Sequence, residues 1–184
     1  MTSKTKKFIT LIIILIILVA VFIFWQNPLN HKTNNGNTEE ISTANLDNAQ
    51  KIEISKGDKT TILQKENDKW LVSSENNAEA NLDYINKLID ALKEVKQGTI
   101  ISQNKDKLAT FELAEGQYTK VKLSDSSNNI LLELLVGKMG PAYTQSYVKK
   151  LNSDNVLLIN QNLLLSITPN SWIKPPETNT NSTK

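Results

Sequence analysis

Alternating apolar and polar side chains predict three short strands in the first half of the chain. Residues 51–55 (KIEIS) alternate with the period of two that is typical of a half-buried strand. Two similar segments follow at residues 60–66 (TTILQKE) and 69–73 (KWLVS), after polar turns at positions 57–58 and 67–68. Tight turns between short strands favour an antiparallel meander. Trp70 is expected to pack on its hydrophobic face.

A helix is predicted next, over residues 81–98. Its apolar side chains recur at intervals of three and four residues, at Leu82, Ile85, Leu88, Ile89, Leu92 and Val95. Asn81 is a suitable N-terminal cap, and Gly98 is expected to end the helix. Because the other side of this segment is charged, the helix should lie on a sheet with that side in water.

The second half shows the same order of strands and then a helix. Strands are predicted at residues 118–124, 130–137, 145–151 and 155–159. The second of these is almost continuously apolar, as expected of a strand that is covered on both faces. A short helix over residues 162–167 should stop before Pro169. The prediction is an α+β fold of antiparallel meander units, each followed by a helix. The repeated order suggests an internal duplication, although no residue-level repeat is visible.

An uncharged apolar run of 18 residues occupies positions 8–25 (FITLIIILIILVAVFIFW). At about 1.5 Å per residue, a helix of this length spans roughly 27 Å, close to the thickness of a bilayer core. We therefore predict a transmembrane signal anchor. Lysines at positions 4, 6 and 7 precede the run, and no charge follows it before Lys32. The positive-inside rule then places residues 1–7 in the cytoplasm.

The predicted location is the cytoplasmic membrane, crossed once, with the C-terminal domain extracytoplasmic. A cleaved signal peptide is the alternative, but its apolar region is usually shorter and ends at a pair of small residues. Here Ala20 is the one small residue near the end of the run. The sequence therefore favours an anchor that stays attached.

Composition divides the remaining chain into a linker, a domain and a tail. Residues 26–45 are rich in Asn and Thr and poor in large apolar side chains, so we expect a flexible linker. Residues 46–173 carry enough Leu, Ile, Val and Phe to form one α+β domain. Residues 174–184 contain two prolines and no apolar residue beyond them, which predicts a disordered tail.

The amino-acid content excludes several classes of protein. The chain has no Cys, so a disulfide scaffold, a zinc finger and a thiol enzyme are excluded. All 21 basic residues are Lys, so no guanidinium group can read guanine edges, and we expect no nucleic-acid partner. The single histidine, His31, lies in the predicted linker, so no His-based metal site or catalytic triad is expected in the domain.

Two Ser-x-x-Lys tetrads, Ser102 to Lys105 and Ser146 to Lys149, resemble a motif of penicillin-binding enzymes, as does the Ser-Asp-Asn at positions 153–155. The second tetrad lies in a predicted strand, however, so its Ser and Lys should point to opposite faces. Ser-Asp-Asn also fits a hairpin turn. Gly137-Lys138 lacks the other residues of a phosphate loop and is expected to end a strand. We predict no catalytic, cofactor-binding or metal-binding residues, and no enzyme.

The order of several short segments resembles the domain of unknown function 4340 family. These segments are the Trp70 strand, the NLDYINKLIDALKEV helix, LATFEL at residues 108–113, and LLELLVGK followed by SYVKKLNSDNVLLI. The resemblance covers residues 46–174. Members often have Gly before the last Leu of the LATFEL segment, where this chain has Glu112. The resemblance implies a small α+β domain on a bacterial membrane anchor, and some relatives are associated with ABC-type export systems, including components linked to gliding motility.

Three functions follow as expectations. The first is a non-enzymatic interaction module of the cell envelope, tethered to the membrane, whose partner is a membrane protein such as an ABC transporter subunit, or an envelope polymer. The second is a domain that binds a lipid or a small hydrophobic ligand, which requires an apolar cavity of several hundred cubic ångströms. The third is a hydrolase that uses Glu133 or Asp154, which requires two carboxyl groups about 5 to 10 Å apart in a pocket. An edge position or a bulge that exposes Glu133 is the simpler expectation.

Overall fold

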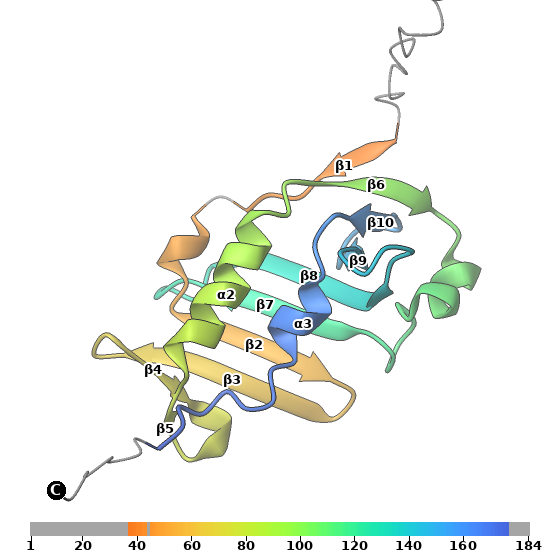
Figure 1. The fold of residues 1–184 in the computed structure, drawn as a ribbon. Helices are drawn as coiled ribbons and strands as arrows, with labels where there is room; N and C mark the ends of the chain where they lie inside the picture. Colours follow the sequence, from red (N-terminus) through yellow and green to blue (C-terminus); the bar gives the residue numbers. More distant parts are fainter. Residues whose placement is uncertain (1–36, 44, 177–184) are drawn as a thin grey trace, which may run out of the picture. The chain divides into compact units, whose positions relative to one another are not determined.

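An antiparallel sheet with helices on one face organises residues 37–43 and 45–176, which are the residues that the computed structural model describes (Figure 1). The strands are β1 (Thr38–Glu40), β2 (Lys51–Lys56), β3 (Lys59–Glu66), β4 (Lys69–Val72), β5 (Ala78–Glu79), β6 (Gln97–Ser102), β7 (Thr119–Ser124), β8 (Ile130–Met139), β9 (Ser146–Lys150) and β10 (Val156–Ile159). The α-helices are α2 (Leu82–Lys93) and α3 (Leu163–Ile167). Short 3₁₀ turns are η1 (Leu46–Asn48), η2 (Ser73–Glu75) and η3 (Lys105–Phe111).

The strands form one sheet in the order β1-β6-β10-β9-β8-β7-β2-β3-β4-β5, and neighbouring strands are antiparallel throughout. The strands predicted from alternation all form, and the helices predicted after them follow at α2 and α3. The α+β class is therefore confirmed.

The main hydrophobic core lies between the sheet and the two helices, which cover the same face (Figure 1). Ile52 and Ile54 of β2 are buried there, as their alternation predicts. From α2, the side chains of Ile85, Leu88 and Leu92 are fully buried against them. Trp70 is 8% exposed and belongs to this core, which confirms its predicted packing role.

A second, smaller cluster covers part of the opposite face of the sheet. It contains buried Leu113, Leu135 and Val156, with Phe111 and Tyr147 packed against them. The Phe111 and Tyr147 rings lie 4.8 Å apart between centroids. Since η3 and the residues after it supply this cover, β8 is buried on both faces over residues 134–137, as predicted from its apolar run, whereas its first residues are less covered.

The order of four strands and then a helix occurs twice, as β2–β5 with α2 and as β7–β10 with α3. The first strands of the two meanders, β2 and β7, pair at the middle of the sheet. After each helix the chain crosses to the other meander. After α2, β6 pairs with β10; after α3, Ile173 bridges to Ala80 beside β5. The repeated order is thus observed, while a common origin of the halves stays a prediction.

The predicted helix over residues 81–98 is too long. It starts after the Asn81 cap, whose side chain accepts a hydrogen bond from the Asp83 amide, but it ends at Lys93. Gly98 lies in β6, where the strand passes so close to β10 that a Cβ atom would stand 2.8 Å from Cβ of Leu157. Leu82, the first helical residue, is 53% exposed and does not belong to the buried stripe.

The predicted boundaries of the domain also change. Part of the linker assigned to residues 26–45 is ordered, because Thr38–Glu40 pair with β6 and Ile41 is buried. Of the tail assigned to residues 174–184, Lys174 is held by its amide, which donates to the Glu79 carbonyl over 2.8 Å. Sheet pairing with distant segments, which composition does not reveal, explains both errors. The anchor at residues 8–25 and the cytoplasmic residues 1–7 lie outside the described residues. Within residues 37–43 and 45–176, each helix is too short or too polar to cross a bilayer.

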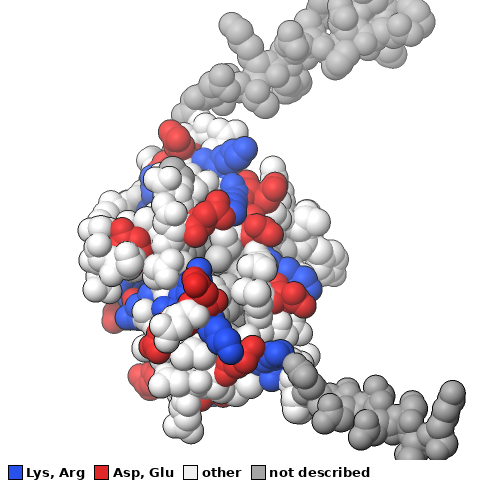
Figure 2. Space-filling view, turned by 90° about the vertical axis from the view of Figure 1, so that its left-hand side faces the viewer, with Lys and Arg blue, Asp and Glu red and all other residues white. Residues whose placement is uncertain are grey.

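Charged side chains of both signs are mixed on the surface that Figure 2 shows, where neither sign gathers into a large patch. This distribution matches the sequence, in which 18 lysines and 19 acidic residues follow the three lysines at the N-terminus. Such a surface gives no strong field for attracting a polyanion.

Strand β8 does not end at Gly137, as predicted, but continues to Met139. A substitution at Gly137 tests how closely η3 packs on β8. A Cβ atom at this position would stand 2.1 Å from the Phe111 carbonyl oxygen, so η3 must retreat in a Gly137→Ala variant. We expect a loss of about 1–3 kcal/mol or more in the free energy of unfolding, measured by urea denaturation.

Gly57→Ala is the matched control. Gly57 has φ +55 and no atom within 4 Å of a Cβ position, so this variant meets backbone strain without a collision and should lose about 1 kcal/mol. A Gly137→Ala loss no larger than that of Gly57→Ala would contradict the close approach of η3 to β8.

Candidate binding clefts

A groove lies between β1 and the first residues of β8, and we call it the edge cleft. It consists of two adjoining hollows of about 780 and 610 Å³, which share Glu39, Ile130, Glu133 and Lys150 among their lining residues. Residues 151–153 and Asn155 of the β9–β10 hairpin line the larger hollow. Residues 39–42 and 130–133 line opposite parts of the smaller one.

The carboxylate of Glu39 is the centre of the polar contacts in this cleft. Its Oε1 lies 2.6 Å from Lys150 Nζ, and its Oε2 accepts hydrogen bonds from Asn155 Nδ2 at 2.6 Å and from Ser153 Oγ at 3.3 Å. Lys150 Nζ also donates to the Glu40 carbonyl oxygen over 2.9 Å. These contacts fasten β1 to the β9–β10 hairpin.

Burial acts on the pKa of Glu39 in the direction opposite to these contacts. Partial burial of the carboxylate raises its pKa, while the hydrogen bonds from Lys150, Asn155 and Ser153 and the charge of Lys150 lower it. The contacts outweigh burial, so the pKa lies below its ordinary value of 4.5. Glu39 is therefore ionised at neutral pH and serves as an acceptor rather than as a proton donor.

The wall formed by β8 has an open strand edge. Strand β8 has ten residues and β9 has five, and their pairing begins at Leu134 opposite Lys150. In the described part of the chain, residues 130–133 pair with β7 on one side and with no strand on the other. Ile130 and Leu151, which are 56% and 45% exposed, border this open edge. The cleft thus combines unpaired backbone with accessible apolar side chains.

The two carboxylates that the hydrolase hypothesis names lie in different places. Glu133 lines the edge cleft where β8 has a partner strand on one side only, but its side chain is just 16% exposed, so the expected exposure is not observed. Its carboxylate lies 3.8 Å from Lys120 Nζ. Asp154 does not line the cleft and forms an ion pair with Lys105 at 3.2 Å. Glu39, a residue of the predicted linker, shares both hollows of the cleft with Glu133, and Glu40 shares the smaller one.

The serine–lysine tetrads have structural roles. Ser146 is fully buried, and its Oγ accepts a hydrogen bond from the Leu163 amide at the start of α3. Lys149 lies opposite Leu135, on the other face of the sheet from Ser146, as the strand alternation predicts. In the first tetrad, the Ser102 Oγ accepts a hydrogen bond from the Asn104 amide. Lys105 of this tetrad pairs with Asp154.

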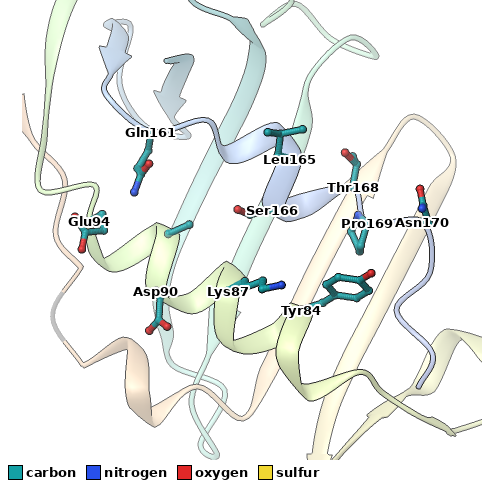
Figure 3. A pocket seen from close by; sticks show the side chains of 11 residues that line it. Tyr84, Lys87, Asp90, Glu94, Gln161, Leu165, Ser166, Thr168, Pro169 and Asn170 are labelled. Atoms are coloured by element: carbon teal, nitrogen blue, oxygen red, sulfur yellow. The ribbon is translucent and has the colours of Figure 1, made fainter. Parts of the chain in front are cut away.

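A second groove, the helix cleft, lies between α2 and α3 and measures about 710 Å³. Figure 3 shows Tyr84, Lys87 and Asp90 on α2, with Leu165 and Ser166 on α3. Lys87 Nζ is 5.7 Å from the centre of the Tyr84 ring, within the range of a cation–π contact. Leu165 is 75% exposed. The lining of the helix cleft is therefore mixed, with charged side chains beside an exposed leucine.

The comparison with family models gives a match over residues 70–181 to the family described as "Domain of unknown function (DUF4340)". The chain belongs to this family. The DUF4340 match runs from β4 through α3, so it includes the open edge of β8, the β9–β10 hairpin and the helix cleft. Neither the curated proteins nor the solved structures contain a match to the chain.

Glu112 adopts φ 55 and ψ 37, the left-handed conformation that Gly adopts without strain. This geometry explains why Gly would suit the turn after η3. No three His, Cys, Asp or Glu side chains gather as a metal site would require within residues 37–43 and 45–176.

The contacts of Glu39 predict how stability depends on pH. Because its pKa is lowered by folding, the carboxylate contributes stability above its ordinary value of 4.5, and this is lost as the pH falls through the lowered folded value. A Glu39→Gln variant should therefore be less stable at pH 7, and its stability should fall less steeply between about pH 5 and pH 3. Urea unfolding across this range measures both effects.

Glu115→Gln is the control, because Glu115 is an exposed carboxylate in the segment between η3 and β7. The stability of this variant should fall with decreasing pH as steeply as that of the parent protein. If Glu39→Gln shows the same pH dependence as Glu115→Gln, the polar contacts of Glu39 do not stabilise the fold.

Proposed function

We propose that this protein is a membrane-tethered, non-enzymatic interaction module of the bacterial cell envelope. In this proposal, residues 8–25 anchor the chain in the cytoplasmic membrane, and the DUF4340 domain binds a membrane-protein partner outside it. The apolar run and the three lysines before it support the anchor and its orientation. The domain itself supplies the binding surface.

The observation that carries the proposal is the composition of the edge cleft. The Glu39 carboxylate is engaged by three side chains, and Glu133 lies beside Lys120, so these charged groups are committed to internal contacts. Meanwhile Ile130, Leu151 and the edge of β8 remain accessible. A cleft of this kind favours binding through backbone and apolar contacts over bond cleavage.

The family resemblance directs the choice of partner. Some relatives are associated with ABC-type export systems, so an ABC transporter subunit is the partner that we propose to look for first. A tether beside such a subunit would raise the local concentration of the domain and allow a weak contact to be occupied.

The helix cleft favours a second candidate, the binding of a small ligand. Its volume of about 710 Å³ lies within the range of small-molecule sites. A lipid or another hydrophobic ligand would meet Leu165 and Tyr84, but also the charges of Lys87 and Asp90. The mixed lining therefore gives this candidate less support than the interaction module has.

The proposal predicts a specific crosslink in living cells. A photoreactive amino acid at Leu151, at the rim of the edge cleft, should crosslink the tagged full chain to a membrane protein that mass spectrometry identifies. The same group at Lys59, an exposed residue at the start of β3, is the control and should give no such product. The protein should sediment with membranes, and deletion of residues 8–25 should release it.

Replacement of residues 8–25 by an unrelated apolar anchor of equal length separates the roles of anchor and domain. If the domain makes the contact, the crosslink from Leu151 survives this replacement. Loss of the crosslink places the contact within the membrane instead. Recovery of the protein alone, while a known complex crosslinks in the same cells, would overturn the proposal.

A further inference from the structure

The open edge of β8 is suited to pairing with an extended strand rather than to binding a helix or a compact ligand. An antiparallel strand directs the N–H and C=O groups of every second residue to one side, so residues 130–133 present hydrogen-bonding groups toward the edge cleft. Unpaired edges of this kind are the sites at which extended peptides add to sheets. The backbone of the peptide then supplies affinity, whatever its sequence.

The opposite wall of the cleft is also an edge. Strand β1 ends the sheet, since among the described residues it pairs with β6 alone. The Glu40 carbonyl oxygen accepts a hydrogen bond from Lys150 Nζ, whose side chain comes from the cleft side. A backbone acceptor of β1 therefore faces the cleft. An extended segment lying there would have a strand edge on each side.

The side chains that line the edge cleft indicate which side chains a bound peptide segment should have. Ile100, Ile130 and Leu151 provide apolar contacts along the larger hollow. Three carboxylates line the two hollows, and two of them are already paired, Glu39 with Lys150 and Glu133 with Lys120. Among the described residues, the exposed Glu40 therefore leaves the lining with one negative charge in excess. This excess of negative charge favours a segment with basic side chains.

We propose that the edge cleft binds an extended peptide segment of a partner protein, with alternating apolar and basic residues, as an added strand beside residues 130–133. This inference rests on the proposed role as an interaction module and specifies the chemistry of the partner. The apolar residues of the segment contact Ile130 and Leu151, and its lysines or arginines meet the acidic lining.

Peptide selection on the full chain in detergent micelles tests this inference. A phage library of random ten-residue peptides is selected on the parent protein after depletion on a Leu151→Lys variant, which adds a positive charge at the cleft rim. Recovered peptides should show alternating apolar and basic residues. Their affinity, measured by fluorescence polarisation, should fall about tenfold or more with Leu151→Lys. Leu165→Lys, the same change at an exposed leucine of the helix cleft, should leave it unchanged.

Two measurements on the recovered peptides test strand addition itself. Methylation of alternate backbone nitrogens should abolish binding in the register whose N–H groups point toward β8 and weaken it less in the other register, because alternate N–H groups of an added strand point to opposite sides. Amide hydrogens of residues 130–133 should exchange more slowly in the complex. Peptides that tolerate methylation at every position, or no peptide surviving depletion, would overturn the inference. Since this selection requires no cellular partner, its failure leaves the crosslinking result as an independent test of the proposed function.

Discussion

The antiparallel pairing of β2 with β7 is the contact on which the rest of this structure depends. It joins two meanders into one sheet and places Ile52 and Ile54 beside Leu123 and Val121 beneath the helices. On the other face, Glu53 lies directly opposite Lys122, with the charged groups 3.3 Å apart. Burial raises the pKa of Glu53, but the hydrogen bonds and charges of Lys51 and Lys122 outweigh this effect and hold the pKa below its ordinary value of 4.5, so the Glu53 carboxylate is ionised at neutral pH.

The path of the chain after each helix adds further contacts between the two meanders. Strand β6, which follows the helix of the first meander, pairs with β10 of the second, and the segment after α3 returns to β5 of the first. Each half therefore completes the edge of the other. Because separation of the halves would break both crossings as well as the β2–β7 pairing, we expect residues 38–174 to unfold as one cooperative unit.

The edge cleft arises from a difference in strand length within this sheet. Strand β8 extends beyond the end of β9, and the chain turns into the β9–β10 hairpin before it can pair with residues 130–133. The contacts of Glu39 with Lys150, Ser153 and Asn155 then hold β1 across the gap. Polar groups are thus used to shape the cleft, while its strand edges and apolar rim stay available to a partner, which is the physical basis of both proposals.

Local patterns by themselves determined most of the strands and the starts of both helices. Alternation identifies β2, β3, β7 and β9, and Asn81 marks the start of α2, because these signals depend on neighbours in the chain. They also indicated the DUF4340 family. Tertiary structure alone decided that Thr38–Glu40 form a strand, that Gly98 enters β6 and that Glu39 meets Lys150. These features depend on partners more than 50 residues away, whose position is set only when the two meanders pair, so no local pattern could reveal them.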